Sequence, residues 1–277
     1  MKKNSLVVKD NALINASYNL DLVEQRLILL AVVGARESGQ GVNANDPLTI
    51  HADSYISHFN VARQTAYQAL KDACRNLFER RFSYQESTKK GSLVEITSRW
   101  VSQIAYIDET ASVQLIFTPA VVPMITALER HFTSYEIEQV SELSSAYAVR
   151  LYEILIAWRS TGKTPVFELA DFRYKLGVES TEYLRMNNFK AKVLDTAIKQ
   201  INLHTDITVK YEQHKRGRSI SGFSFTFKQK NATKKLATTK PRRQNITKKE
   251  AEEMAYLGES WPDLLARLTS QYHIIDM

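Results

Sequence analysis

The stretch YLRMNNFKAKVLDTAIKQINLHTDITVKYEQHKRGRSISGFSFTFKQK, residues 183–230, changes its hydrophobic period once along its length. Over 187–204 apolar side chains recur every four positions, which predicts one long helix with a buried stripe. The stripe consists of Phe189, Val193, Ala197 and Ile201, with Leu194 and Ile198 beside it. Apolar and polar residues then alternate over 207–211 and over 223–227, which predicts two strands. We therefore expect a long helix followed by a hairpin.

The opposite face of this predicted helix is basic. Near the helix N-terminus it carries Arg185, Asn188, Lys190 and Lys192. The turn between the strands, residues 214–218, is cationic and contains a glycine that allows a tight bend. Solvated surface helices are often charged too, but a basic helix joined to a basic hairpin tip is typical of a winged helix-turn-helix. Such a helix enters the major groove of double-stranded DNA, and the tip lies on the neighbouring backbone.

Chemistry divides these candidate DNA-binding residues into two groups. Arginine and asparagine pair with guanine and adenine edges, so Arg185 and Asn188 are expected to read bases. Lysine more often contacts phosphate. The turn residues Lys215, Arg216 and Arg218 are expected to contact phosphates as well.

The composition favours a globular protein with an anionic partner. The 277 residues suit two domains and a tail, and the formal net charge is +7 with a pI of about 9.3. The single cysteine, Cys74, cannot form an internal disulfide and is expected to be buried. The N-terminus lacks a long apolar signal sequence, and the longest apolar run, residues 27–33, is too short to span a bilayer. We therefore expect a protein of the reducing cytoplasm.

The first half of the chain shows the same order of elements as the second. We predict helices at 21–37, 52–59, 62–81, 119–130 and 145–159, a further helix capped by Thr133 and Glu136, and a short helix at 170–176. Strands are predicted at 48–51, 82–85, 94–107, 113–118 and 166–169. A long helix, a short strand, a short helix, a long helix and a hairpin thus occur twice. PLTIHAD at 47–53 and PVFELAD at 165–171 share a proline and an Ala-Asp pair at equal spacing, which favours a duplication.

The predicted fold class is therefore α+β, with two tandem winged-helix domains and a basic C-terminal tail. The expected boundaries are 1–130 for the first domain, 131–230 for the second and 231–277 for the tail. The second long helix of the first domain carries Arg63, Gln64, Gln68 and Lys71 on its polar face. These four are also candidate DNA-binding residues, although the same face could be solvated or could contact a second copy.

The tail divides into two parts of opposite charge. Residues 228–249 contain nine lysines or arginines and no acidic residue, whereas 250–277 contain six acidic residues and one arginine. The basic part is too polar to fold by itself and is either a tether to DNA or a solubilising linker. Ser260 and Asp263 form a capping pattern that predicts a short amphipathic helix ending near Tyr272. This helix could dock on the body or on a partner.

Other chemistries find little support. Residues 160–164, STGKT, resemble the end of a phosphate-binding loop, but Ala157 stands where a glycine is needed and a helix precedes it. The six histidines include no His-x-His pair of the kind that a rolling-circle nicking enzyme would use. No spaced set of carboxylates indicates an active site. We therefore expect no catalytic residues, no metal and no cofactor.

Several residues together give the chain a resemblance to a known family over about residues 6–230. They are Asn11, Ala16, Leu20, Glu24 and Arg26, the segment 147–153, Asn188-Phe189-Lys190, Ile201-Asn202, and Lys215-Arg216-Gly217-Arg218 leading to Phe223 and Phe225. On these residues the chain resembles the initiator Rep proteins of iteron-containing bacterial plasmids, the group that includes RepE and Pi. The resemblance extends in particular to the small replicons of Acinetobacter and to related circular DNAs.

This resemblance implies a function. Monomers would bind direct repeats, called iterons, at a plasmid origin and help to open an adjacent AT-rich region. Dimers would bind an inverted repeat in the operator of the gene and repress it. The second domain would supply the main major-groove contacts, and the first would supply further contacts and much of the dimer interface. Host DnaA and the replicative helicase would be partners, and no catalysis is implied. The alternatives are a tandem winged-helix transcriptional regulator and, with less support, a rolling-circle nicking enzyme.

Overall fold

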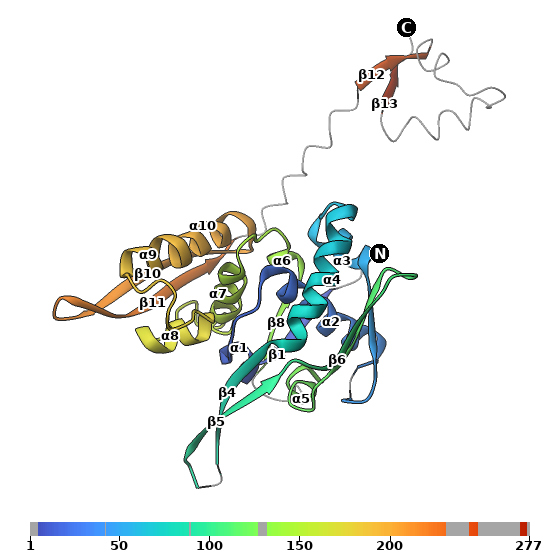
Figure 1. Cartoon of the computed structure of the whole chain (residues 1–277). Helices are drawn as coiled ribbons and strands as arrows, with labels where there is room; N and C mark the ends of the chain where they lie inside the picture. Colours follow the sequence, from blue (N-terminus) through green and yellow to red (C-terminus); the bar gives the residue numbers. More distant parts are fainter. Residues whose placement is uncertain are drawn as a thin grey trace. The chain divides into compact units, whose positions relative to one another are not determined.

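The computed structural model describes residues 5–41, 43–88, 90–126, 132–230, 244–248 and 272–275. The chain divides into two compact units, Met1–Gln229 and Lys230–Met277. The first unit contains the described helices and four of the five sheets (Figure 1). The second unit contains the remaining pair of strands. The two units are described separately below.

The first winged helix contains five helices and seven strands among the described residues. Its elements are β1 (Leu6–Asp10), α1 (Asn11–Asn15), β2 (Ser17–Tyr18), α2 (Leu22–Ser38), β3 (Leu48–His51), α3 (Ala52–Phe59), α4 (Arg63–Glu79), β4 (Arg81–Ser87), β5 (Leu93–Arg99), β6 (Val101–Ile107), β7 (Ser112–Phe117) and α5 (Val122–Thr126). The predicted cap of α2 is confirmed, because Asp21 accepts from the Glu24 amide at 2.8 Å and donates its own amide to the Glu24 carboxylate at 2.7 Å. Residues 127–130 of the predicted connecting helix lie outside the described residues.

The predicted single strand at 94–107 is wrong. The structure has two strands there, β5 in the sheet β2-β4-β5 and β6 in the sheet β3-β7-β6. Trp100, between them, is fully buried and packs edge-on against Tyr18 with ring centroids 4.9 Å apart. The bend at Trp100 lets one continuous segment serve both sheets. No glycine, proline or asparagine marks the bend in the sequence, so one continuous strand was predicted.

The second half of the unit, residues 132–229, includes the second winged helix. Its elements are β8 (Phe132–Glu136), α6 (Glu138–Ser141), α7 (Ala146–Ile156), β9 (Phe167–Glu168), α8 (Leu169–Leu176), α9 (Met186–Phe189), the π-helical turn η1 (Lys190–Leu194), α10 (Asp195–His204), β10 (Ile207–Arg216) and β11 (Ser219–Gln229). The sheet order is β10-β11-β9. In Figure 1, α9 and α10 lie along the long β10–β11 hairpin.

The helix predicted to be capped by Thr133 and Glu136 is also wrong. These residues belong to strand β8, which pairs antiparallel with β1 so that Val7 lies opposite Tyr135. Thr133 and Tyr135 point inward while their neighbours are more exposed, as expected for a half-buried strand. The partner strand lies far away in the sequence, close to the N-terminus. Local pattern alone therefore did not identify this pair.

The core of the second winged helix is aromatic. Phe172 on α8 lies at its centre, with ring centroids 5.3 Å from Phe225, 5.8 Å from Phe223 and 6.2 Å from Phe189. All four rings are almost completely buried. Phe189 comes from the basic-faced helix and the two other rings from β11. This cluster therefore fixes the helix against the hairpin.

A buried polar cluster lies between the two winged helices, and we call its five members the Glu153 cluster. They are Lys9, Tyr18, Tyr135, Arg150 and Glu153. The Glu153 carboxylate accepts from Lys9 Nζ and Tyr135 OH, both at 2.6 Å, from Arg150 Nη1 at 2.9 Å and from Tyr18 OH at 3.3 Å. All donors come from segments that pack on α7 or from α7 itself. A buried carboxylate with four donors is fully satisfied.

Arg150 extends this cluster into the second winged helix. Its Nη2 donates to the carbonyls of Ile14 at 3.0 Å, Ala16 at 2.9 Å and Lys175 at 2.7 Å, and Lys175 is near the end of α8. The next turn, at Gly177, has φ +73° and lies so close to β2 that a Cβ would be 1.9 Å from the Tyr18 carbonyl oxygen. Only glycine fits this position. The two winged helices are thus joined by direct contacts, not only by the chain.

The tail unit has one described pair of strands. β12 (Gln244–Thr247) and β13 (Tyr272–Ile275) are parallel, with Ile246 opposite Ile274. The segment predicted to be an unstructured basic linker thus ends in a strand that pairs with the last residues of the chain. Tyr272, the predicted end of the terminal helix, begins β13 instead. The remaining residues of that predicted helix, with Ser260 and Asp263, lie outside the described residues.

The Glu153 cluster predicts a dependence of stability on pH. Burial alone would raise the pKa of Glu153, but Lys9, Arg150 and the Tyr135 hydroxyl lower it to about 2. A glutamate in the unfolded chain has a pKa of about 4.3. The folded pKa is therefore depressed, and the stability that it contributes is present above about pH 4.3 and is lost as the pH falls toward 2.

We expect Glu153→Gln to flatten this acid limb and also to lower the free energy of unfolding at pH 7 by about 3–5 kcal/mol, because Lys9 loses its buried partner. Urea unfolding followed by circular dichroism between pH 3 and pH 7 measures both effects. Glu142→Gln is the matched control, since Glu142 is exposed and contacts only the surface residue His204 in the described structure. An acid limb as steep in Glu153→Gln as in the wild type would contradict the assignment.

Candidate nucleic-acid interface

The basic-faced helix of the second winged helix is continuous from Met186 to His204 but contains one π turn. The predicted helix is confirmed, and its stripe is buried at Phe189, Val193, Ala197 and Ile201. The Asp195 amide donates to the Lys190 carbonyl, five residues back. Such a wide turn often marks a functional site, and here it brings both Val193 and Leu194 into the core. We call this element, α9 through α10, the recognition helix.

Three of the four residues predicted on the recognition helix are available to a ligand. Arg185 is the N-cap residue, and Arg185, Asn188 and Lys192 are exposed. Their side chains have no hydrogen-bonding or ionic partner within the described part of the chain. Lys190 differs, because its Nζ donates to Gln213 Oε1 at 3.1 Å and lies 5.7 Å from the Tyr211 ring centroid. Lys190 therefore also ties the helix to strand β10.

The hairpin β10–β11 forms the wing, and its cationic residues are Lys215, Arg216 and Arg218. All three are exposed. The predicted five-residue turn is shorter in the structure, since β10 continues to Arg216 and pairs with Ser219 across only Gly217 and Arg218. Gly217 has φ +64°, while Arg218 is not among the residues with positive φ. A glycine at the first of two turn positions matches the tight turn that the twist of a hairpin favours.

The wing tip and the N-terminus of the recognition helix lie at the same end of the domain (Figure 1). The contact between Lys190 and Gln213 holds helix and strand together near that end. The helix start and the wing tip at this end carry six cationic or amide side chains that the sequence analysis selected separately, and none of them pairs with another side chain of the described residues: Arg185, Asn188, Lys192, Lys215, Arg216 and Arg218. A helix end that reaches bases and a hairpin tip that reaches phosphates need this proximity.

The corresponding helix of the first winged helix, α4, differs in its electrostatics. Arg63 pairs with Asp53 at 2.8 Å, and Gln68 donates to Asp72 at 3.0 Å. Lys71 pairs with Asp108, whose hydrogen bond raises the pKa of Lys71. Of the four predicted residues on α4, only Gln64 is exposed without a side-chain partner among the described residues. Neighbouring carboxylates therefore offset the positive charge of this face, and the sequence pattern gave no sign of that.

Two features of the site were not found from the sequence. Arg173 on α8 donates to three carbonyls of the turn before the recognition helix, and Tyr147 on α7 contacts the same turn through Glu182. Tyr147 acts across 35 residues of sequence, and Arg173 binds an irregular turn that has no hydrophobic period, so no local pattern indicates either residue.

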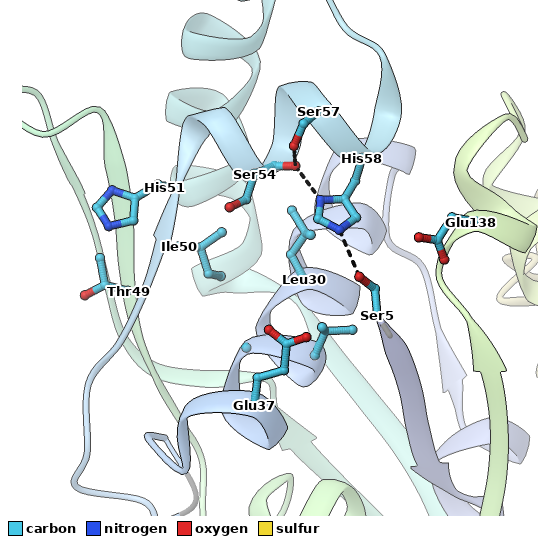
Figure 2. Close-up of a pocket in the computed structure, with 12 residues that line it drawn as sticks. Ser5, Leu30, Glu37, Thr49, Ile50, His51, Ser54, Ser57, His58 and Glu138 are labelled. Atoms are coloured by element: carbon cyan, nitrogen blue, oxygen red, sulfur yellow. Dashed lines mark hydrogen bonds between the residues drawn. The ribbon is translucent and has the colours of Figure 1, made fainter. Parts of the chain in front are cut away.

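A polar pocket lies away from this interface, in the first winged helix. It has a volume of about 430 Å³ and is lined by Ser5 and by residues of α2, β3, α3 and α6. Figure 2 shows His58 across its middle, with Nδ1 2.8 Å from the Ser54 carbonyl oxygen and Nε2 3.2 Å from Ser5 Oγ. None of the candidate DNA-binding residues lines it.

Family profiles match both halves of the chain. Residues 6–156 match the family described as initiator replication protein, WH1, and residues 168–227 match initiator Rep protein, WH2. The first match alone covers more than half of the chain. The chain belongs to the initiator replication protein family. The predicted pair of winged-helix domains is thereby confirmed, as is the resemblance to plasmid replication initiators.

Individual relatives agree with this family. A replication initiation protein of Escherichia coli is 25% identical over 227 residues, covering 79% of this chain and 68% of that protein. The solved structure of Pi initiator protein in complex with iteron DNA has a TM-score of 0.68 at 22% identity and covers 83% of this chain and 100% of that chain. This similarity shows a common fold. The WH1 domain of MSBI1.176, a replication protein isolated from a multiple sclerosis patient, is 71% identical over 44% of this chain and 92% of that chain, with a TM-score of 0.37.

The described residues include neither a membrane-spanning helix nor a cluster of metal ligands. No helix among them is long and apolar enough to cross a membrane. In the same part of the chain, no group of three or more His, Cys, Asp or Glu side chains is arranged to hold a metal ion.

Basic residues of α4 pair with carboxylates, whereas those of the wing do not within the described residues. Removal of one charge from each face should therefore change the salt dependence of DNA binding differently. Lys215→Ala should weaken binding to all duplex sequences alike and reduce the slope of log K against log salt by about 0.9, the value for one lost phosphate contact. Arg63→Ala removes the same charge but should change the slope less, because Asp53 already engages Arg63. Titration of a random-sequence duplex at several salt concentrations measures both slopes. Equal flattening in the two variants would mean that α4 contacts the backbone as closely as the wing does.

Proposed function

We propose that this protein initiates plasmid replication by binding direct repeats, or iterons, in double-stranded DNA at the origin. The observation that carries the proposal is the group of six cationic and amide side chains at one end of the second winged helix, none of which pairs with another side chain of the described residues. Membership of the initiator family and the common fold with Pi, which was solved with iteron DNA, support it. Residues 131–230 are the main reading head, with Arg185 and Asn188 on bases and the lysines and wing arginines on phosphates.

The proposal also assigns a role to the first domain and names the partners of the protein. Residues 1–130 supply the dimer interface and secondary DNA contacts through Arg63, Gln64, Gln68 and Lys71, the weaker of the two faces because of its paired acids. Monomers bind iterons and help to open the origin, and dimers bind an operator inverted repeat and repress the gene. Host DnaA and the replicative helicase then act in the bacterial cytoplasm, and the protein itself performs no catalysis. The tail, residues 231–277, adds a basic segment beyond the family match.

A transcriptional regulator without a replication role would use the same binding chemistry. Arrangement of the sites distinguishes the two functions, because an initiator needs several direct repeats whereas a repressor needs one inverted repeat. A nicking enzyme would instead cut supercoiled DNA in a metal-dependent reaction, which a gel assay detects.

Footprinting of the DNA upstream of the gene at two salt concentrations tests the proposal. We expect regularly spaced protected direct repeats, with protection that weakens at the higher salt. A single protected inverted repeat would favour the plain repressor, and the absence of protection above competitor DNA would exclude sequence-specific binding at this locus.

The proposal also predicts the effect of removing one base contact. Arg185→Ala should weaken binding to the specific site by about 1–3 kcal/mol and relax specificity at a single base pair. Competition between site variants that differ at one position measures this change. If Arg185→Ala weakens all sequences equally, Arg185 contacts a phosphate and not a base.

A further inference from the structure

The turn that precedes the recognition helix holds one residue in an unfavourable backbone conformation. Tyr183 has φ +43°, in the left-handed region that bulky residues seldom adopt. Such a conformation persists only where the surroundings impose it, and it is found most often at functional sites. In this chain it occurs three residues before the first residue of α9.

Contacts from two elements, α8 and α7, hold this turn in place. Arg173 on α8 donates to the carbonyls of Glu182 at 2.6 Å, and of Glu179 and Tyr183 at 3.3 Å each. Its guanidinium also lies 5.1 Å from the ring centroid of Phe189 on the recognition helix. From α7, the Tyr147 hydroxyl donates to the Glu182 carboxylate at 3.2 Å. The turn is therefore fixed relative to the recognition helix.

The consequence of this fixed turn is the position of Leu184. It lies between Tyr183 and the N-cap residue Arg185, and its exposed fraction is 78%, the largest among the exposed large apolar residues of the described structure. Burial of a leucine is favourable, so the fold gives up that gain here. The residues around it, Arg185 and Asn188, are the ones that we assign to base edges.

We propose that Leu184 is a specificity-determining residue that contacts the 5-methyl group of a thymine in the major groove. This inference rests on the proposed binding of double-stranded DNA by the recognition helix. The thymine methyl is the apolar feature of the major-groove edge, and side chains at the N-terminal end of a recognition helix reach that edge. Arginine and asparagine recognise bases through hydrogen bonds. A leucine beside them adds recognition of an A·T pair through the thymine methyl group.

Deletion of the methyl group from DNA tests the contact directly. The full chain first selects duplexes from a random-sequence pool, and each thymine of the selected site is then replaced in turn by deoxyuridine. We expect one replacement to weaken wild-type binding about fourfold. This factor corresponds to about 0.8 kcal/mol, the free energy gained by burying one apolar carbon group. The same replacement should have no effect on Leu184→Ala. Leu203→Ala is the matched control, because Leu203 is 68% exposed on α10 and should keep the wild-type response.

The outcomes separate this inference from the proposed function. Enrichment of a specific site together with equal deoxyuridine responses in the wild type and Leu184→Ala would overturn the role of Leu184 and leave sequence-specific binding intact. Failure to enrich any site would overturn both. Arg173 is a positioning residue for Leu184. The variant Arg173→Lys keeps the positive charge but cannot donate to three carbonyls in the same way, so it should lose the methyl dependence as Leu184→Ala does. Wild-type methyl dependence in folded Arg173→Lys would show that Arg173 does not position Leu184.

Discussion

The Glu153 carboxylate is the constraint on which the arrangement of this protein depends. It is buried among Lys9, Tyr18, Tyr135 and Arg150, and Arg150 in turn binds carbonyls of both winged helices. Buried ion pairs add little net stability compared with apolar packing, but they penalise every arrangement in which one partner is left unpaired. Here the partners come from β1, β2, β8 and α7, so the cluster is complete only when these elements meet in one geometry.

That geometry determines what the reading surface can do. Helix α7 carries both Arg150 and Glu153, and it also carries Tyr147, which contacts the turn before the recognition helix. The aromatic cluster around Phe172 fixes the recognition helix against the wing. A side chain that reads bases must be held by a rigid support, and here the support runs from the polar cluster through α7 and α8 to the helix N-terminus. At the end of the second winged helix that carries the wing tip, the cationic side chains then have no partner among the described residues and are available to a ligand.

Local sequence patterns predicted the second winged helix well and the connections between domains poorly. Phe189, Val193, Ala197 and Ile201 have a helical period that depends only on their own segment, and the hairpin and the cap at Asp21 are equally local. Strand β8 was mistaken for a helix because its partner β1 lies far away in the sequence, and the bend at Trp100 depends on packing against Tyr18. The candidate residues on α4 were selected by charge, but Asp53 and Asp108, which pair with Arg63 and Lys71, come from other elements. Arg173 and Leu184 gained their importance only from the folded turn.

The structure of the full chain bound to a duplex carrying its own repeats would test the central claim most directly. The account predicts that the N-terminal end of the recognition helix lies in the major groove, with Arg185 and Asn188 against base edges and Lys215, Arg216 and Arg218 on the adjacent backbone. It also predicts that the Glu153 cluster is intact in the complex. A complex in which α4 occupies the major groove, or in which the wing of the second domain points away from the DNA, would contradict it.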